Sequence, residues 1–268
     1  MIVYPNAKIN LGLNVHSKLN NGYHLLQSYF LPVPLVDILE IVPSEGNGHV
    51  EFSSSGIEIS GNNNLCEQAY SILNTVKSLP SVKIHLHKQI PIGAGLGGGS
   101  ADASFTLKTL NKMFNLDYSN TELENFAKQL GADCPFFIDN TSKFIEGIGE
   151  IMTPVNTDAL KSKILVLVFP NIHISTQEAY SGIKLQPKEN FNAFKFEEFH
   201  TYKDNLHNNF ESHIFETYPE LEQIKTDLYN QGAFYASMSG SGSTMFGIFD
   251  TEPNLSFNKD YELFRVKL

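Results

Sequence analysis

The stretch that decides the fold is PIGAGLGGGSADAS, residues 91–104. Five of the seven residues from Gly93 to Gly99 are glycines. Residues 82–88, just before the stretch, alternate polar and apolar side chains and predict a β-strand, whereas the residues after the glycines have helical spacing. Glycines between a strand and a helix N-terminus leave successive backbone N–H groups open to an anion. Two glycines would be enough for a turn, so the sequence predicts a phosphate group that approaches the main chain closely.

Two general phosphate-binding patterns compete for this loop. Residues 93–98 match the dinucleotide-binding pattern G-x-G-x-x-G, and Asp117 has the spacing of the acid in such sites, but its surroundings resemble a helix end. Residues 93–100 also resemble a Walker A loop, although Gly99 stands where that loop requires a lysine. The Walker A interpretation therefore fails, and a nicotinamide-dependent oxidoreductase remains a rival hypothesis.

The composition limits the classes of partner. The 268 residues are enough for two modest domains. A net charge of -10 and the lack of any basic run argue against a nucleic-acid partner. Arg265 is the only arginine, so the chain supplies no internal arginine finger. The two cysteines, Cys66 and Cys134, are too few for a disulfide framework, and we expect both thiols to be reduced.

Nothing in the sequence predicts a membrane anchor. The first fifteen residues resemble a strand and not a signal peptide. The longest strongly apolar run, residues 164–169, is too short to cross a bilayer. We therefore expect a cytoplasmic protein without a membrane partner. His85 and His87 alternate on a predicted strand and indicate a solvated face, and no set of residues has convincing metal-ligand spacing.

The remaining periodicities predict a mixture of strands and helices. Polar residues alternate with apolar ones over residues 7–15, which places Lys8 and Asn10 on one face of a strand. Thr121 and Glu124 indicate a capping box, and Gly131 is expected to end that helix just before Asp133. We expect a domain boundary in the polar segment 153–163, which gives domains of residues 1–155 and 156–268. The predicted strands are 37–42, 50–53 and 164–169, and the predicted helices are 64–78, 101–114, 121–130, 205–215 and 219–230.

A second glycine-rich loop lies far from the first in the sequence. It comprises Ser239, Gly240, Ser241 and Gly242, and a strand is predicted on either side of it. By itself it would be a hairpin turn. Together, the two loops suggest that one polyphosphate is held by both.

These motifs are specific enough to identify a family. PIGAGLGGGSADAS resembles the phosphate-binding loop of the GHMP kinase superfamily, whose pattern is roughly P-x-x-x-G-L-G-[SG]-[SG]-[SG]-A, and MSGSGSTMFGIF resembles its C-terminal glycine motif. The similarity extends from Ala7 to Phe249. AKINLGLNV, NGYHLLQSYF, LGADCPFF and EGIGEIMTPV narrow it to members that act on a cytidine-diphospho sugar alcohol in non-mevalonate isoprenoid precursor synthesis.

The resemblance implies a fold and a reaction. The fold would be α+β, the GHMP kinase fold, with an N-terminal ribosomal-protein-like α/β domain followed by a C-terminal ferredoxin-like domain. The chain would be an ATP-dependent kinase, a monomer or homodimer, that phosphorylates the 2-hydroxyl of its acceptor, with Mg²⁺ held mostly by the ATP phosphates. The nearest alternative is a related kinase acting on mevalonate or homoserine. A regulatory module that binds nucleotide without turnover is a further alternative.

The resemblance also implies roles for individual residues. Asp133 would be the catalytic acid–base residue, and Lys8 would pair with it. Tyr23 and Tyr180 would sandwich the cytosine ring, and His24 would read its polar edge. The other substrate-binding residues would be Asn10 and Thr176. The ATP site would comprise Asn64 and Lys88 near the adenine, together with Pro91, Gly93, Gly95, Leu96, Gly97, Gly98, Gly99, Ser100 and Ala101.

The sequence departs from the family pattern at one position. The family often has an acid before the Gly-Tyr-His run, whereas this chain has Asn21. We expect Asn21 to shape the turn and to take no part in the chemistry. The resemblance identifies no protein ligands for a metal.

Overall fold

The computed structural model describes residues 1–61, 64–188 and 194–268. The chain forms two compact units, and each is assembled from several segments. Unit 1 contains Met1–Lys8, Pro34–Ile92 and Gly97–Thr141. Unit 2 contains Ile9–Val33, Gly93–Leu96 and Ser142–Leu268. The domain boundary at residue 155 stays a prediction, because it divides the chain by sequence order and the units do not.

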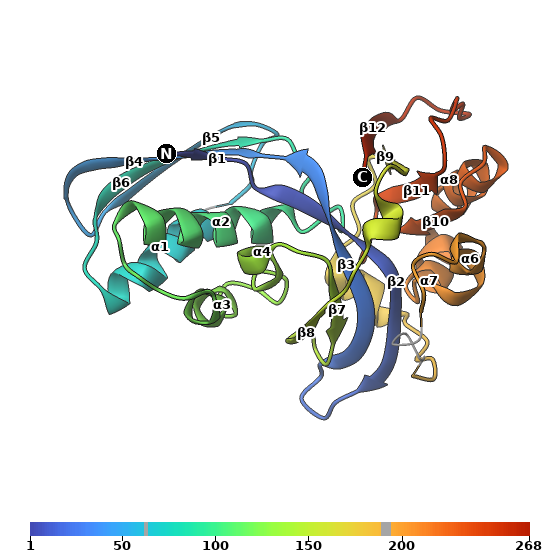
Figure 1. The fold of residues 1–268 in the computed structure, drawn as a ribbon, viewed down its shortest axis with the longest axis horizontal. Helices are drawn as coiled ribbons and strands as arrows, with labels where there is room; N and C mark the ends of the chain where they lie inside the picture. The colour runs from blue at the N-terminus through green and yellow to red at the C-terminus, as the bar shows by residue number, and fades with distance from the viewer. Residues whose placement is uncertain (62–63, 189–193) are drawn as a thin grey trace. The chain divides into compact units, whose positions relative to one another are not determined.

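Unit 1 is built on a four-stranded sheet with the order β1-β4-β6-β5. Strand β5 pairs parallel with β6, and the other pairs are antiparallel. Helices α1 and α2 cover one face of this sheet (Figure 1). The strands are β1 (Ile2–Val3), β4 (Ile38–Asn47), β5 (Val50–Gly56) and β6 (Pro80–Lys88), and the helices are α1 (Leu65–Val76), α2 (Gly98–Met113), α3 (Asn120–Ala127) and α4 (Phe136–Asp139).

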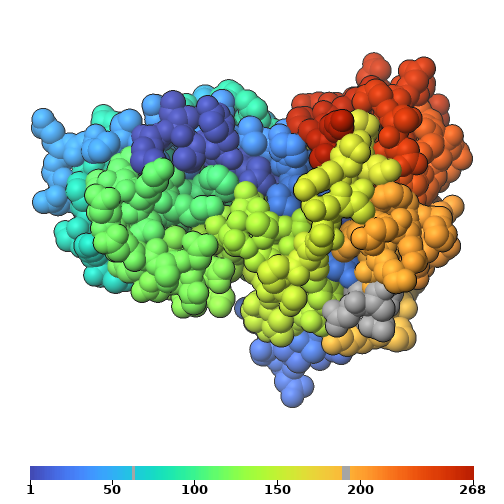
Figure 2. All heavy atoms as spheres, viewed as in Figure 1, coloured from blue at the N-terminus to red at the C-terminus, as the bar shows by residue number. Residues whose placement is uncertain are grey.

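The alternation along β6 decides which face of the sheet is buried. Ile84 and Leu86 point into the core, which also contains Leu73 of α1 and Leu107 of α2. Lys83, His85 and His87, which have the opposite parity, are half-buried or exposed, as predicted for a solvated face. The ring of His85 is bonded to two serines of β5. The short strand β1, in dark blue, also lies at the surface (Figure 2).

Two helix starts in unit 1 are fixed by capping boxes. Asn64 caps α1 with Glu67 at the third helical position. The box predicted at Thr121 and Glu124 is wrong, because Ser119 is the N-cap of α3 and pairs with Glu122. The segment contains two overlapping S/T-x-x-E patterns, and the chain uses the earlier one. The predicted end of this helix at Leu130, before Gly131, is also wrong, because α3 ends at Ala127 with Lys128 as its C-cap.

Unit 2 contains two antiparallel sheets. The first has the order β2-β3-β7-β8 and the second has the order β10-β11-β9-β12. The first residues of β2 and the last residues of β3 belong to unit 1. The strands are β2 (Asn6–Lys18), β3 (His24–Val36), β7 (Lys143–Glu146), β8 (Ile151–Pro154), β9 (Ile164–Phe169), β10 (Tyr235–Met238), β11 (Met245–Phe249) and β12 (Glu262–Lys267).

The helices of unit 2 confirm one prediction and correct another. Helix α8 (Pro219–Asn230) is confirmed, with proline in its first turn. The single helix predicted over residues 205–215 is wrong. The chain leaves helix α6 (Tyr202–Asn205) in an extended conformation at Leu206, runs beside β2, and begins helix α7 at Glu211. The remaining elements are α5 (Thr176–Ser181), α7 (Glu211–Thr217) and the 3₁₀ turns η1 (Asp158–Leu160) and η3 (Phe199–Thr201).

Candidate active site

Lys8 and Asp133 form an ion pair within unit 1. Lys8 Nζ lies 3.6 Å from Asp133 Oδ2. The lysine side chain is 4% exposed and the aspartate side chain 36% exposed, so one partner is buried and the other is open to a ligand. Burial lowers the pKa of the Lys8 ammonium, and the charge of Asp133 partly offsets this effect. The structure thus brings together the two residues that the sequence predicted to pair.

The local sequence explains the position of Asp133. It lies in the turn between α3 and α4, where Cys134 N donates to the Gly131 carbonyl. Phe136 and Phe137, which follow, are fully buried and anchor this turn from below. The backbone next to the Asp133 carboxylate is therefore anchored by a turn hydrogen bond and by two buried aromatic side chains.

The first glycine loop leads into an open helix N-terminus. Helix α2 begins at Gly98, earlier than the predicted residue 101. Its N-cap, Gly97, has φ 70° and ψ 15°, and no side chain caps the helix. A side chain at Gly97 would meet the Phe137 ring at 3.0 Å and the Lys8 stem at 3.2 Å. The first N–H groups of α2 are thus not occupied by a capping side chain, which fits a phosphate group.

Within unit 2, Gly95 lies directly against the second glycine loop. A Cβ atom on Gly95 would stand 1.9 Å from the carbonyl oxygen of Ser239. Ser239 Oγ donates to the Gly95 carbonyl at 2.9 Å, and Thr244 N donates to the Ala94 carbonyl at 3.3 Å. The structure therefore brings the two loops together, as the sequence suggested, and only glycine fits at this contact.

Asn10 is held on β2 by a neighbour that the sequence did not single out. Its side-chain amide donates to Ser28 Oγ at 3.0 Å, and Ser28 Oγ donates to the Gly12 carbonyl at 2.6 Å. Both side chains are buried, so the polar face predicted for this strand is not solvated. No local signal marks Ser28, because its role depends on the pairing of β2 with β3.

Two of the three predicted base-binding residues, His24 and Tyr180, form an aromatic group with Phe210 in unit 2. The rings of His24 and Tyr180 lie 4.8 Å apart with an angle of 30° between their planes. Phe210, which the sequence did not single out, meets Tyr180 edge to face at 4.8 Å. Tyr23 is 58% exposed, and its contact with a base stays a prediction. Burial and the charge of Lys18 lower the pKa of His24, which favours a neutral ring.

Two other predicted residues, Asn64 and Lys88, have local structural partners, and a third, Thr176, is exposed. Asn64 Oδ1 accepts from Cys66 N at 2.8 Å as the cap of α1. Lys88 is buried between two carboxylates. Thr176 is the exposed first residue of α5. The contacts of these three residues with a substrate stay predictions.

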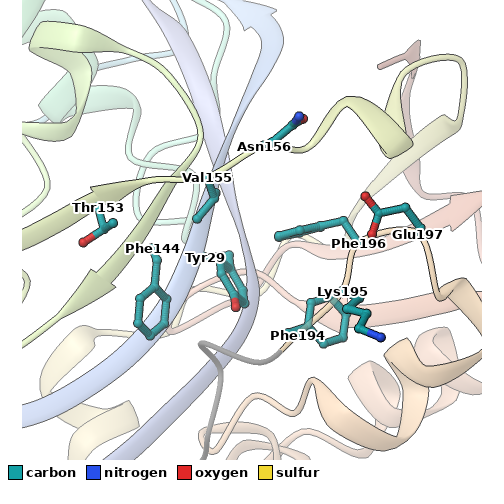
Figure 3. Close-up of a pocket in the computed structure, with 9 residues that line it drawn as sticks. All are labelled: Tyr29, Phe144, Thr153, Val155, Asn156, Phe194, Lys195, Phe196 and Glu197. Atoms are coloured by element: carbon teal, nitrogen blue, oxygen red, sulfur yellow. The ribbon is translucent and has the colours of Figure 1, made fainter.

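A further pocket in unit 2 contains none of the predicted site residues (Figure 3). Its volume is about 370 Å³. Tyr29 and Phe144 stand side by side in it, with ring centres 5.0 Å apart. The complete lining is Tyr29, Phe144, Thr153, Val155, Asn156, Phe194, Lys195, Phe196 and Glu197.

No group of three or more histidines, cysteines, aspartates or glutamates among the described residues is arranged to hold a metal ion. Within the same part of the chain, no helix combines the length and the apolar character needed to cross a membrane.

Comparison with known proteins identifies the class. The family model for the GHMP kinase N-terminal domain matches residues 64–140, and the C-terminal model matches residues 188–256. The chain belongs to the GHMP kinase family, and the GHMP kinase fold predicted from its sequence is confirmed. It is therefore a kinase with ATP as its co-substrate.

The names of the most similar proteins are more specific than the family name. The chain is 51% identical over 253 residues to a 4-diphosphocytidyl-2-C-methyl-D-erythritol kinase of Azobacteroides pseudotrichonymphae, and this match covers 93% of each chain. It is 47% identical to the protein of that name from Bacteroides fragilis, over 98% of this chain and 96% of the relative. A crystal structure of 4-(cytidine 5'-diphospho)-2C-methyl-D-erythritol kinase matches with a TM-score of 0.80 and 30% identity, over 92% of this chain and 90% of the other.

Proposed function

We propose that this protein transfers the γ-phosphoryl group of ATP to the 2-hydroxyl of 4-diphosphocytidyl-2-C-methyl-D-erythritol, in isoprenoid precursor synthesis. The observation that carries the proposal is the Lys8–Asp133 pair, in which a buried cation stands beside an exposed carboxylate. The names of relatives up to 51% identical support the choice of acceptor over mevalonate or homoserine.

The end of the first glycine loop and the start of α2 supply the phosphate-binding groups in this proposal. Gly97, Gly98 and Gly99 would hold the ATP phosphates through backbone N–H groups, at the positive end of a helix dipole. The absence of a capping side chain at Gly97 supports this role. Mg²⁺ would be carried mainly by the phosphates and would neutralise charge on the transferred group.

Asp133 would orient the acceptor hydroxyl and accept its proton late. An alcohol is a weaker acid than a carboxylic acid by roughly a dozen pKa units, so complete deprotonation beforehand would cost about 16 kcal/mol. Phosphoryl transfer does not require that step, because its transition state is loose and needs little nucleophilic push. Lys8 would stabilise the negative charge on the transferred group.

The aromatic group of unit 2 would bind the cytosine ring. Stacking of a base on an aromatic side chain contributes about 1–3 kcal/mol. The Tyr180 ring packs edge to face against Phe210 and lies next to the His24 ring, and these contacts would help to position it for a base. Mevalonate and homoserine have no ring to stack, and this difference would favour the cytidine-linked acceptor.

A substrate panel tests the proposal. The purified protein is incubated with ATP, Mg²⁺ and one acceptor at a time, and ADP formation is followed by a coupled assay. We expect turnover with 4-diphosphocytidyl-2-C-methyl-D-erythritol and none with mevalonate or homoserine. Turnover with either of the other two alcohols, and none with the first, would overturn the choice of acceptor.

A further inference from the structure

Three ionisable side chains in unit 1 form a buried cluster, and one of them, Lys88, is the residue that the resemblance places near the adenine of ATP. Lys88 Nζ donates to Asp102 Oδ2 at 2.8 Å and to Asp37 Oδ2. The side chains of Lys88 and Asp102 are 3% exposed, and that of Asp37 is fully buried. A charge cluster this deep is costly unless it has good geometry and further hydrogen bonds.

Asp37 fixes the chain where it enters the glycine loop. Its Oδ1 accepts from Gln89 N at 2.6 Å and from Ile90 N at 2.9 Å. These two residues lie between the end of β6 and Pro91, the first residue of the loop motif. Because both N–H groups point to one carboxylate oxygen, the direction in which the chain leaves β6 is set by Asp37.

Lys88 and Asp102 fix the chain where it leaves the loop. Asp102 lies on α2, one turn after its first residue. A Cβ atom on Gly98, the first residue of α2, would lie 2.9 Å from Lys88 Nζ and 2.9 Å from Ile90 Cγ2. The ammonium group therefore packs directly against the helix start that offers its N–H groups to phosphate. One cluster thus holds both ends of the loop.

The charges of the cluster do not balance when all three groups are ionised. One cation and two carboxylates leave a net charge of -1, and a buried unpaired charge is strongly unfavourable. Two carboxyl groups in contact relieve this by sharing a proton. Asp37 accepts two backbone N–H groups and the ammonium, all of which favour its ionised form. Asp102 Oδ1 has no hydrogen-bond partner among the described residues, so the proton belongs on Asp102.

The electrostatics of the neighbouring groups agree with this assignment. Burial, together with the charge of Asp37, raises the pKa of Asp102 to about 7, although Lys88 opposes the change. Burial disfavours the Lys88 ammonium, but the two carboxylates outweigh it and raise the pKa of Lys88 above its usual value. Cys66 faces the cluster from α1, and burial raises the pKa of its thiol, which stays neutral.

We infer that Lys88, Asp37 and Asp102 are positioning residues for the phosphate-binding glycine loop, and that they act as a charge-neutral cluster with one proton held on Asp102. The inference rests on the proposed function, because that proposal assigns the ATP phosphates to this loop. When Asp102 loses its proton, a negative charge appears one helical turn below the phosphate-binding N–H groups. Nucleotide affinity then falls.

The test measures binding of a nonhydrolysable ATP analogue with Mg²⁺ by calorimetry, without any acceptor. Lys88→Met removes the cation and should raise the Kd at least tenfold, whereas Asp102→Asn keeps the neutral form and should bind like the wild type at pH 6. The matched control is Lys83→Met, on the same strand, because Lys83 pairs with Glu51 at an exposed site. We expect its Kd to be unchanged.

A pH series keeps the inference testable if Lys88→Met does not fold. Between pH 6 and 8 the wild-type Kd should rise at least threefold relative to that of Asp102→Asn measured in the same buffers. A constant ratio overturns the inference, as does a folded Lys88→Met protein that binds the analogue as tightly as the wild type. Failure of the wild type to bind the analogue at all would instead refute the proposed ATP site, so the two failures are distinct.

Discussion

Gly95→Ala tests the contact between the two glycine loops. Gly95 has φ +77°, a conformation that costs an L-residue about 1–2 kcal/mol. The new Cβ would stand 1.9 Å from the Ser239 carbonyl oxygen, so the loops must separate by about 1 Å, with an overpacking cost of about 1–3 kcal/mol. We expect the variant to lose about 3 kcal/mol of stability.

The assay for this prediction is thermal unfolding with a matched control. A loss of about 3 kcal/mol corresponds to a fall in Tm of about 6–12 °C for a protein of this size. Gly99→Ala is the control, because its Cβ would meet only Leu65 Cδ1, at 3.6 Å, and alanine is favoured over glycine in a helix by up to about 1 kcal/mol. Its Tm should be unchanged or higher. Equal Tm values for Gly95→Ala and the wild type would refute the reasoning, as would equal losses in both variants.

Three further predictions concern the chemistry and the ionisation of the protein. Asp133→Asn should leave the Kd for nucleotide within about threefold and lower kcat by about a hundredfold or more, because general acid–base groups contribute at least that much. Calorimetry measures the Kd and steady-state kinetics measure kcat. A kcat equal to that of the wild type would contradict the assigned role. The proton on Asp102, whose pKa is raised from 3.8 to about 7, binds the folded state more tightly, so its stabilisation is complete below pH 4 and disappears as the pH rises through 7. Denaturant unfolding should therefore show the wild type losing up to about 1.4 kcal/mol per pH unit relative to Asp102→Asn between pH 4 and 7, and parallel curves would count against a shared proton. Phe210→Leu should raise the KM for the cytidine-linked acceptor about threefold to tenfold and leave the KM for ATP unchanged. The substitution removes the edge-to-face contact with Tyr180, which contributes about 0.5–1.5 kcal/mol. A proportional rise in both KM values would indicate a general packing defect instead.

The glycine loop and its flanking elements could be predicted because their signals are local. The alternation of β6, the five glycines and the helical spacing of α2 stand next to each other in the sequence. The pairing of Lys8 with Asp133 came from the family resemblance and not from spacing, since the two lie far apart in the chain. Its geometry, 3.6 Å with one buried partner, appears only in the folded unit.

The missed features depend on tertiary contacts or on competing local signals. Strand β3 contains Pro32 and Pro34, and proline weakens any strand prediction. The extended segment after Leu206 forms backbone hydrogen bonds with β2. The local helical spacing does not reveal these partners, because β2 lies far away in the sequence. The buried cluster around Lys88 joins side chains from three separate parts of the sequence, and each alone resembles an ordinary surface charge.

The most direct test of the central claim is phosphorus NMR of the product formed from ATP, Mg²⁺ and 4-diphosphocytidyl-2-C-methyl-D-erythritol. The account predicts one new phosphomonoester resonance in the wild type, from a phosphate group attached to the 2-hydroxyl oxygen of the acceptor. It predicts no such resonance with Asp133→Asn on the same timescale. Release of ATP phosphate only as inorganic phosphate, or equal product formation by the two proteins, would contradict it.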